Sequence, residues 1–361
     1  PSMALYAEVN TIGGEVDDDV DNTFLTFIRT EDVDTGAWVS GAPAPNVSQD
    51  TLEQVDAKEH KVQRRKMAFK QEFFSKFRNN EQSEEAPATE AAATARTSFI
   101  KECENAKIAP KPLMFGRQDL VNINLSNFGI SATTASALAA GLKLTPSVEV
   151  LDISNNALGD EAVHAVTDAL AHTMHVTSLN LSHTGVRRLP PPLVRMIKES
   201  KCLKELSLAG LNLDPQNVAS LLDILSRNRV LAKLDLSNNR IMGKSGAHLS
   251  EMLSVNAALT DLDLSWNCLR TNSAGTFCEG LSFNGHLRRL SLAWNGFGDI
   301  VTTKKLMEAL AQGSPRLTSL DLSYNRIHDR AAIIIAEALP DMPDLRELIM
   351  DGNPLGKLGG R

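Results

Sequence analysis

Hydrophobic positions recur along most of the chain in units of about 28 residues. From Leu120 onward the pattern L-x-x-L-x-L-x-x-N-x-L appears nine times, in full or in part. The clearest copies are "LAKLDLSNNRI" (231–241), "LTDLDLSWNCL" (259–269), "LRRLSLAWNGF" (287–297) and "LTSLDLSYNRI" (317–327). Self-similarity of this period indicates a repeat architecture, in which each unit is one supersecondary element.

Each unit combines two hydrophobic periods. Leucines at alternate positions predict a short strand whose leucines point inward. The second half has a helical period, and in residues 159–173 the apolar positions share one face. These positions are Ala162, Val163, Val166, Ala169 and Leu170. A single unit cannot bury this surface alone, so neighbouring units must stack into a parallel sheet covered by helices.

An asparagine follows the strand in six units. Where the chain leaves the strand, backbone N–H and C=O groups lose their ladder partners, and an Asn amide can both donate and accept. The predicted structural asparagine ladder consists of Asn156, Asn239, Asn267, Asn295, Asn325 and Asn353. Phe128, Thr184 and Leu211 replace the asparagine in the other three units, where we expect less regular turns.

Directly before this asparagine, three consecutive units carry a large aromatic residue, Trp266, Trp294 or Tyr324. Stacking of the units should bring the rings side by side at the rim of the sheet, about 5 Å apart. Two interpretations stay open. The rings shield the asparagine turns, or they also bind a partner or the N-terminal segment, since binding energy concentrates in aromatic residues. The acidic binding candidates on the neighbouring strands are Asp235, Asp263 and Asp321.

The first 96 residues lack the repeat. Residues 1–47 are acidic and contain Gly and Pro, which predicts an extended segment. Residues 48–80 predict an amphipathic helix with a basic middle, "KVQRRKMAFKQEFFSKFR". It would dock on the repeats or on a partner such as acidic tubulin or a coiled coil, with a membrane surface or calmodulin as further alternatives. Its binding candidates are Arg64, Arg65, Lys66, Phe69, Phe73 and Phe77. Residues 81–96 are a low-complexity linker.

Composition and motifs favour a binding protein over an enzyme. The formal net charge of −7 is mixed in sign and gives no nucleic-acid signal. No stretch approaches the roughly 20 apolar residues of a membrane span. "GKSGA" (243–247) lacks the upstream glycine of a phosphate-binding loop, and the histidines lack metal-ligand spacing. We therefore expect no catalytic residue, cofactor or metal, and other proteins as partners. Four cysteines predict reduced, buried thiols, namely Cys103, Cys202, Cys268 and Cys278.

The 28-residue units, each with a helix, resemble ribonuclease-inhibitor-type leucine-rich repeats. The resemblance covers residues 118–361 and implies an α/β fold, a curved right-handed solenoid with parallel strands inside and helices outside. It leaves the function open, because that subfamily includes inhibitors, GTPase-activating proteins, immune receptors and ciliary scaffold proteins. The ninth unit stops before its helix, at "DGNPLGKLGGR", which indicates either a fragment of a longer protein or chain ends that are not resolved in a large assembly.

The stretch "SFIKECENAKIAPKPLMFG" (98–116) is similar to the capping segment of ciliary and flagellar leucine-rich repeat proteins, such as the leucine-rich repeat-containing protein 74-like group. In a cap over 97–117, the side chains of Phe99, Ile100, Cys103 and Ile108 would cover the open end of the core. This resemblance implies a non-enzymatic scaffold of the axoneme, in the cytoplasm and cytoskeleton, that bridges axonemal proteins or microtubules. The alternatives are a Ran-GAP-like GTPase regulator and a ligand-sensing or inhibitory module.

Overall fold

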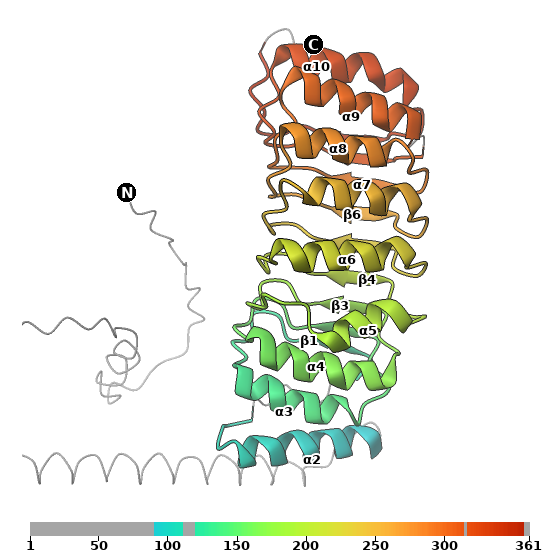
Figure 1. The fold of residues 1–361 in the computed structure, drawn as a ribbon. Coiled ribbons are helices and arrows are strands. Elements are labelled where there is room, and N and C mark those ends of the chain that lie inside the picture. Colours follow the sequence, from blue (N-terminus) through green and yellow to red (C-terminus); the bar gives the residue numbers. More distant parts are fainter. Residues whose placement is uncertain (1–89, 111–119, 314–315, 357–361) are drawn as a thin grey trace, which may run out of the picture. The chain divides into compact units, whose positions relative to one another are not determined.

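The computed structural model describes residues 90–110, 120–313 and 316–356, which all fall within one compact unit, Lys66–Arg361. Strands and helices alternate along this part of the chain (Figure 1). The strands are β1 (Asn122–Asn124), β2 (Val150–Asp152), β3 (Ser178–Asn180), β4 (Glu205–Ser207), β5 (Lys233–Asp235), β6 (Asp261–Asp263), β7 (Arg289–Ser291), β8 (Ser319–Asp321) and β9 (Glu347–Ile349). The helices are α2 (Glu90–Asn105), α3 (Ala132–Leu142), α4 (Gly159–Thr173), α5 (Pro191–Glu199), α6 (Pro215–Arg227), α7 (Ser245–Val255), α8 (Thr271–Leu281), α9 (Ile300–Gly313), α10 (Asp329–Ala338) and the 3-10 helix η4 (Leu339–Asp341).

The strands of the described residues form one open parallel sheet in sequence order, from β1 to β9. The middle residue of each strand pairs with the middle residue of the next, as Leu234 does with Leu262 and Leu262 with Leu290. This central row is isoleucine in β1 and leucine in the other strands, and it is buried from β1 to β8. Since each strand pairs only with those of adjacent units, the predicted stacking of repeats into a parallel sheet is confirmed.

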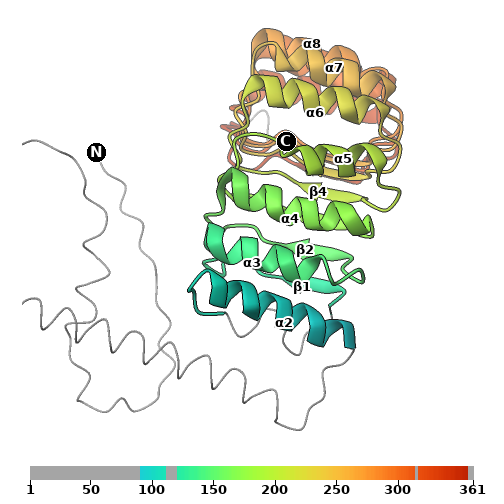
Figure 2. The ribbon, with the colours of Figure 1, turned by 60° about the horizontal axis from the view of Figure 1, so that its bottom comes forward.

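The helices form a second layer along the sheet, which Figures 1 and 2 show from two directions. In α4 the predicted inward face is confirmed, because all five of its apolar positions are at most 1 % exposed. Helices α7 and α8 approach each other through small residues. A Cβ added at Gly280 of α8 would collide with the carbonyl oxygen of Ser250 in α7, and one at Gly246 of α7 would collide with Ser273 of α8. The helix layer is therefore close-packed at this point.

Helix α2 packs against α3 at the first end of the repeat stack and begins at Glu90, inside the range that the sequence assigns to a linker. The Ala-rich composition that reads as low complexity also has a high helix propensity, which explains the earlier start. Its buried side chains are Ala95, Phe99, Ile100 and Cys103. Burial, with smaller effects from Glu102 and Glu104, raises the pKa of the Cys103 thiol to about 12, so this thiol stays neutral and packs as an apolar group.

All four cysteines are free thiols. Cys103 and Cys278 are buried as the sequence predicts. The same prediction is wrong for Cys202 and Cys268, which are only half-buried. Both lie in connecting loops, after α5 and after β6, where the chain runs along the edge of the core.

Candidate protein-binding site

One position in every repeat lies in the left-handed region of the backbone. It is the position that precedes the ladder asparagine, where the chain leaves the strand, and its φ lies between 54° and 65° in all nine units. The residues in this position are Asn127, Asn155, His183, Gly210, Asn238, Trp266, Trp294, Tyr324 and Gly352. Glycine and asparagine tolerate this backbone well, whereas a positive φ is unusual for a bulky side chain. Three consecutive repeats therefore place a large ring where the backbone favours a small or polar residue.

Trp266, Trp294 and Tyr324 form a continuous stack, which we call the aromatic ridge. The ring centroids are 4.1 Å apart between the two tryptophans and 4.3 Å apart between Trp294 and Tyr324, and both pairs of planes meet at 14°. The backbone N–H of Trp266 donates to the Ala293 oxygen at 2.8 Å, and Trp294 and Tyr324 bond to the next repeat in the same way. The register of the sheet thus extends to the ridge. The three side chains remain 54, 40 and 44 % exposed, in chain order.

The middle ring of the ridge presents its edge rather than its faces. Both faces of the Trp294 indole are covered, one by Trp266 and the other by Tyr324. The Tyr324 ring lies so close to Gly352 that a Cβ at that glycine would collide with it. Gly352 therefore closes the stack with a residue that leaves room for the tyrosine.

Beside the ridge, the outward residues of the strands line a groove of about 590 Å³. Asp263 in β6 and Trp266 in the ridge are three residues apart, a chain length of at most about 11 Å. The ridge therefore begins close to the end of the groove. The charged lining residues are six carboxylates and two cations: Asp152, Glu205, Asp235, Asp261, Asp263, Asp321, Lys233 and Arg289.

Both cations of the groove are engaged by its own carboxylates. Lys233 Nζ lies 2.5 Å from Glu205 Oε1, and Arg289 Nε pairs with Asp261 Oδ1. Among the described residues, no ion pair involves the remaining four carboxylates, Asp152, Asp235, Asp263 and Asp321. With six acidic and two basic side chains, the groove carries a formal charge of −4.

The unpaired carboxylates also hold the ends of their strands. Asp263 Oδ1 accepts the backbone N–H of Ser265 at 2.8 Å, and Asp235 Oδ1 accepts that of Ser237 at 2.9 Å. Asp263 is half-buried, and burial raises the pKa of its carboxyl. Hydrogen bonds from Ser265 oppose this rise in pKa, whereas the charges of Asp235 and Asp321 add to it. A cation that entered the groove at this point would favour the ionised form of Asp263.

The asparagine ladder lies directly beneath the ridge. The Asn267 Nδ2 donates to the carbonyl oxygens of Leu236, Leu264 and Ser265 at 3.0–3.2 Å. Its Oδ1 accepts the N–H groups of Asn239 and Ile241 at 3.1 and 2.8 Å. One buried amide thus satisfies backbone groups of two repeats next to Trp266, and this fixes the point from which the ring projects.

The units without a ladder asparagine keep the same backbone turn. In the third unit the buried Thr184 hydroxyl donates to the Leu181 oxygen at 2.7 Å. The left-handed residues of these three units, Asn127, His183 and Gly210, have φ values of 57°, 54° and 64°, close to those elsewhere. The prediction of less regular turns is therefore wrong for the backbone of the left-handed residue. Hydrogen bonds to the next unit fix its φ even where the ladder asparagine is absent.

A second asparagine ladder, absent from the sequence-based prediction, supports the loops that lead back to the strands. The Asn256 Nδ2 donates to the Leu225 oxygen at 2.7 Å, and its Oδ1 accepts the N–H groups of Ala258 and Leu259 at 2.9 Å. Asn228 and Asn284 make the equivalent bonds in the adjacent units. The signal in the sequence is N-x-x-L just before three consecutive units, as "NRVL", "NAAL" and "NGHL".

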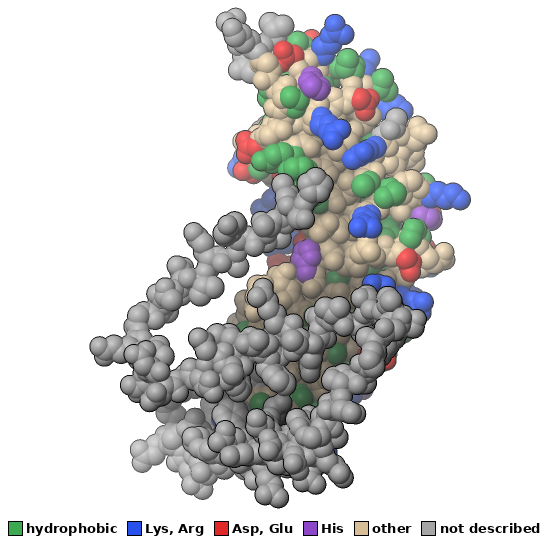
Figure 3. All heavy atoms as spheres, turned by 90° about the vertical axis from the view of Figure 1, so that its left-hand side faces the viewer, with side chains coloured by type: hydrophobic (Ala, Val, Ile, Leu, Met, Phe, Trp, Pro, Cys, Tyr) green, Lys and Arg blue, Asp and Glu red, His purple; other side chains and the backbone are tan. Residues whose placement is uncertain are grey.

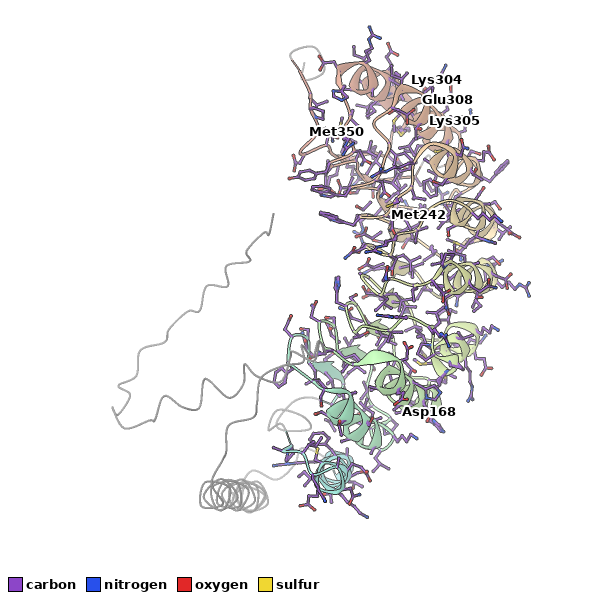
Figure 4. All side chains as sticks on the ribbon, turned by 60° about the vertical axis from the view of Figure 1, so that its left-hand side comes forward. Asp168, Met242, Lys304, Lys305, Glu308 and Met350 are labelled. Carbon is purple, nitrogen blue, oxygen red and sulfur yellow. The ribbon has the colours of Figure 1, made fainter. Side chains whose placement is uncertain are left out.

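The helix layer presents charges of both signs. In α9 Lys304 pairs with Glu308 at 3.8 Å, and Figure 4 shows both on the helix side of the molecule, away from Met350. Asp168 of α4 pairs with Lys143 at 3.0 Å, and the hydrogen bond from this lysine lowers the pKa of the carboxyl. On the side shown in Figure 3, acidic, basic and hydrophobic side chains are interspersed over the upper half of the molecule. The side chains visible there do not form a uniformly basic surface.

The six candidates of the basic helix, Arg64, Arg65, Lys66, Phe69, Phe73 and Phe77, lie outside the residues that the structure describes. Within the described ranges, no group of His, Cys, Asp or Glu side chains is arranged to hold a metal ion. No helix in these ranges is both long enough and apolar enough to span a bilayer.

One family model matches parts of the chain. Residues 146–166, 255–278, 283–300 and 313–336 match a family model described as leucine rich repeat. No curated protein sequence matches the chain.

The similar solved structures include two internalins of Listeria monocytogenes. Internalin C2 is 19 % identical, with 63 % of this chain and 84 % of that one covered, at a TM-score of 0.38. Internalin F is 15 % identical, with 74 % and 82 % covered, at a TM-score of 0.39. The C-terminal domain of tropomodulin from Caenorhabditis elegans is 15 % identical, with 42 % and 91 % covered, at a TM-score of 0.36. The matched segments and the in-register parallel strands together show that units of this chain are similar to leucine-rich repeats.

Proposed function

We propose that the protein is a non-enzymatic, protein-binding scaffold, and that the aromatic ridge and the groove beside it form its binding surface. The observation that carries this proposal is the ridge. Trp266, Trp294 and Tyr324 occupy left-handed positions that the other repeats give to Asn, Gly or His, and each ring is at least 40 % exposed. Exposed aromatic clusters of this kind are typical of binding hot spots.

Stacking does not by itself account for the rings. A left-handed backbone costs an ordinary L-residue about 1–2 kcal/mol, and asparagine or glycine avoids much of this cost. Each of the two stacked pairs contributes about 0.5–1.5 kcal/mol beyond burial. For three rings the backbone cost sums to about 3–6 kcal/mol, whereas the two pairs contribute about 1–3 kcal/mol, so stacking offsets only part of the cost. Stability alone therefore does not explain why these three positions carry rings. Binding to a partner would explain it.

We place this scaffold in the ciliary or flagellar axoneme, where it would bridge axonemal proteins or microtubules. The support for this setting is the sequence resemblance of residues 98–116 to the capping segment of ciliary repeat proteins. Helix α2 is compatible with that resemblance, because Phe99 and Cys103 are fully buried at the first end of the repeat stack. The implied location is the cytoplasm and cytoskeleton of ciliated or flagellated cells.

The test is affinity capture from an axonemal extract with the full chain, followed by quantitative mass spectrometry. The comparison variant is Trp294→Asn, which removes a ring and keeps a residue that suits the left-handed position. The control is Glu308→Gln on α9, away from the surface in question. We expect a set of axonemal proteins that the parent and the control capture equally and that Trp294→Asn captures at a small fraction of that level.

Two results would contradict the proposal at different levels. If capture of every protein is the same with Trp294→Asn as with the parent, the ridge is not the binding surface. If ridge-dependent partners are found but none is axonemal, the setting is wrong and the scaffold stands. Acceleration of GTP hydrolysis by about 10³-fold in a captured GTPase would replace the scaffold by a GTPase regulator.

A further inference from the structure

We infer that this surface recognises a basic peptide segment with an adjacent apolar side chain. Lysine or arginine residues of the partner would pair with the groove carboxylates that lack an ion pair, and the apolar side chain would lie on the ring edges of the ridge. The inference rests on the proposed binding function and adds the chemistry of the partner to it.

The charge of the groove selects a cationic partner. Lys233 and Arg289 are neutralised by Glu205 and Asp261, so an anionic ligand would meet no free cation from the groove lining. The four remaining carboxylates are half-buried, and charge pairs in such surroundings are screened less than fully exposed ones. Electrostatic complementarity of this type sets which partners bind and how fast they associate.

The spacing of the carboxylates favours a partner with more than one basic residue. Asp235 and Asp263 are register partners on adjacent strands, so their backbones are separated by the strand spacing of about 4.8 Å. Side chains four apart on a helix are about 5–6 Å apart, and alternate side chains of an extended chain are about 6.8 Å apart. Either arrangement brings two basic side chains of one short segment to this pair.

The middle ring of the ridge offers a cation no open face. A cation binds an aromatic ring over its face. Both faces of Trp294 are occupied by its neighbours, at 4.1 and 4.3 Å between centroids, and one face of Tyr324 is covered by Trp294. The exposed ring edges suit apolar contacts. We therefore assign the cations to the groove and the apolar side chain to the ring edges of Trp294 and Tyr324.

The test is fluorescence anisotropy with three labelled synthetic peptides of equal length and the full chain. The first contains two lysine–arginine pairs next to leucine and phenylalanine, the second has alanine in place of the leucine and phenylalanine, and the third has glutamate in place of the basic residues. We expect the first to bind, with an affinity that falls as salt is raised, the second to bind more weakly, and the third not to bind.

Variants assign each part of the peptide to its part of the surface. Asp235→Asn with Asp263→Asn should weaken binding of the first peptide by about tenfold or more, because two negative charges without an ion pair are lost. The fold should persist, because Asn124 and Asn180 occupy the same strand position in other units, with their Oδ1 atoms accepting the equivalent N–H groups. Trp294→Asn should abolish the advantage of the first peptide over the second.

The matched control is Glu308→Gln with Glu337→Gln, which removes two carboxylates from a second groove, between α9 and α10. If this control weakens binding as much as the change at Asp235 and Asp263, attraction is general and the inference is overturned. Binding of the glutamate peptide would overturn it as well. Ridge-dependent capture from the extract combined with failure of all three peptides would leave the proposed function standing and refute this partner chemistry.

Discussion

At the scale of single residues, the left-handed backbone decides which substitutions the ridge tolerates. Trp294→Asn and Trp294→Ala both remove the two ring contacts of Trp294. Asparagine suits a φ of 55°, as it does at Asn155 and Asn238, whereas alanine leaves an ordinary L-residue in a strained conformation. We expect the asparagine variant to be more stable than the alanine variant by about 1 kcal/mol. Urea denaturation of the two proteins measures this difference.

The control for this order of stability, asparagine above alanine, is an exposed site with a right-handed backbone. Ile333 in α10 is 43 % exposed and helical, so alanine there should be more stable than asparagine. If alanine is also the better replacement at Trp294, backbone strain does not govern the ridge.

The pKa of Asp263 leads to a second expectation at this scale. Its folded-state pKa is raised above the ordinary value of 3.8, chiefly by burial, so the folded state binds the proton more tightly than the unfolded state. The charged carboxylate therefore lowers stability at neutral pH. This loss is relieved as the pH falls through the raised pKa towards 3.8. We expect Asp263→Asn to be more stable than the parent at pH 7, with a difference that shrinks as the pH is lowered towards 3.8, when both are unfolded by urea.

A parallel series with Asp168→Asn should show the reverse sign, because Lys143 lowers the pKa of Asp168 and its ionised form is favoured in the folded state. If Asp263→Asn is less stable than the parent at pH 7, the hydrogen bonds of the charged carboxylate at the strand end stabilise the fold by more than the cost of burying its charge.

The spacing of the repeats is sufficient to predict that Trp266, Trp294 and Tyr324 are neighbours, and the centroid distances of 4.1 and 4.3 Å confirm it. The left-handed backbone was not predicted, because hydrophobic periodicity carries no information on φ. A comparison of all nine units at this position would have shown it, since asparagine and glycine together fill five of them. The binding roles of the ridge, of Asp235, Asp263 and Asp321, and of the basic helix stay predictions.

At the scale of elements, two glycines of α8 should respond in opposite ways to the same substitution. Alanine normally stabilises a helix interior relative to glycine, by about 0.5–1 kcal/mol. At Gly275 the nearest atom to an added Cβ is the flexible Lys305 Nζ at 3.3 Å, so Gly275→Ala should be neutral or stabilising. At Gly280 the added Cβ would collide with the backbone of Ser250 in α7, so Gly280→Ala should be destabilising.

Thermal unfolding of the two variants measures the contrast within one helix. Overpacking of a close contact typically costs about 1–3 kcal/mol, which exceeds the gain in helix propensity. Equal effects of the two substitutions would mean that α7 and α8 can separate without cost.

The sequence predicted elements where periodicity is strong and missed those where it is weak. The inward face of α4 follows from its apolar spacing. The second ladder of Asn228, Asn256 and Asn284 lies in loops, where no hydrophobic period points to it. Helix α2 starts before the expected cap, because alanine contributes little hydrophobic pattern even though Ala95 is fully buried.

At the scale of the whole molecule, stacked repeats make the fold quasi-one-dimensional. Each strand pairs with the strand of the next unit, so the stability of the described part should be a sum of unit terms and nearest-neighbour terms. The sequence predicts this directly, because the same leucine pattern recurs in each unit. Segments 1–47 and 48–80 lie outside this repeat and outside the described residues, and their predicted structures remain predictions.

Pairs of small core changes test this property. Leu262 and Leu290 are register partners on β6 and β7, whereas Leu151 on β2 and Leu320 on β8 are separated by five intervening strands. Each Leu→Val change removes one buried methylene and should cost about 1 kcal/mol. For Leu151 with Leu320 the two losses of stability should add to within about 0.5 kcal/mol, because the sites share no packing partner.

For Leu262 with Leu290 the loss in the double variant should deviate from the sum of the single losses by more than about 0.5 kcal/mol, since both cavities open into the same layer. Denaturant unfolding of the four single and two double variants measures the deviation from additivity for each pair. A large deviation for Leu151 with Leu320 would show that coupling extends along the whole stack.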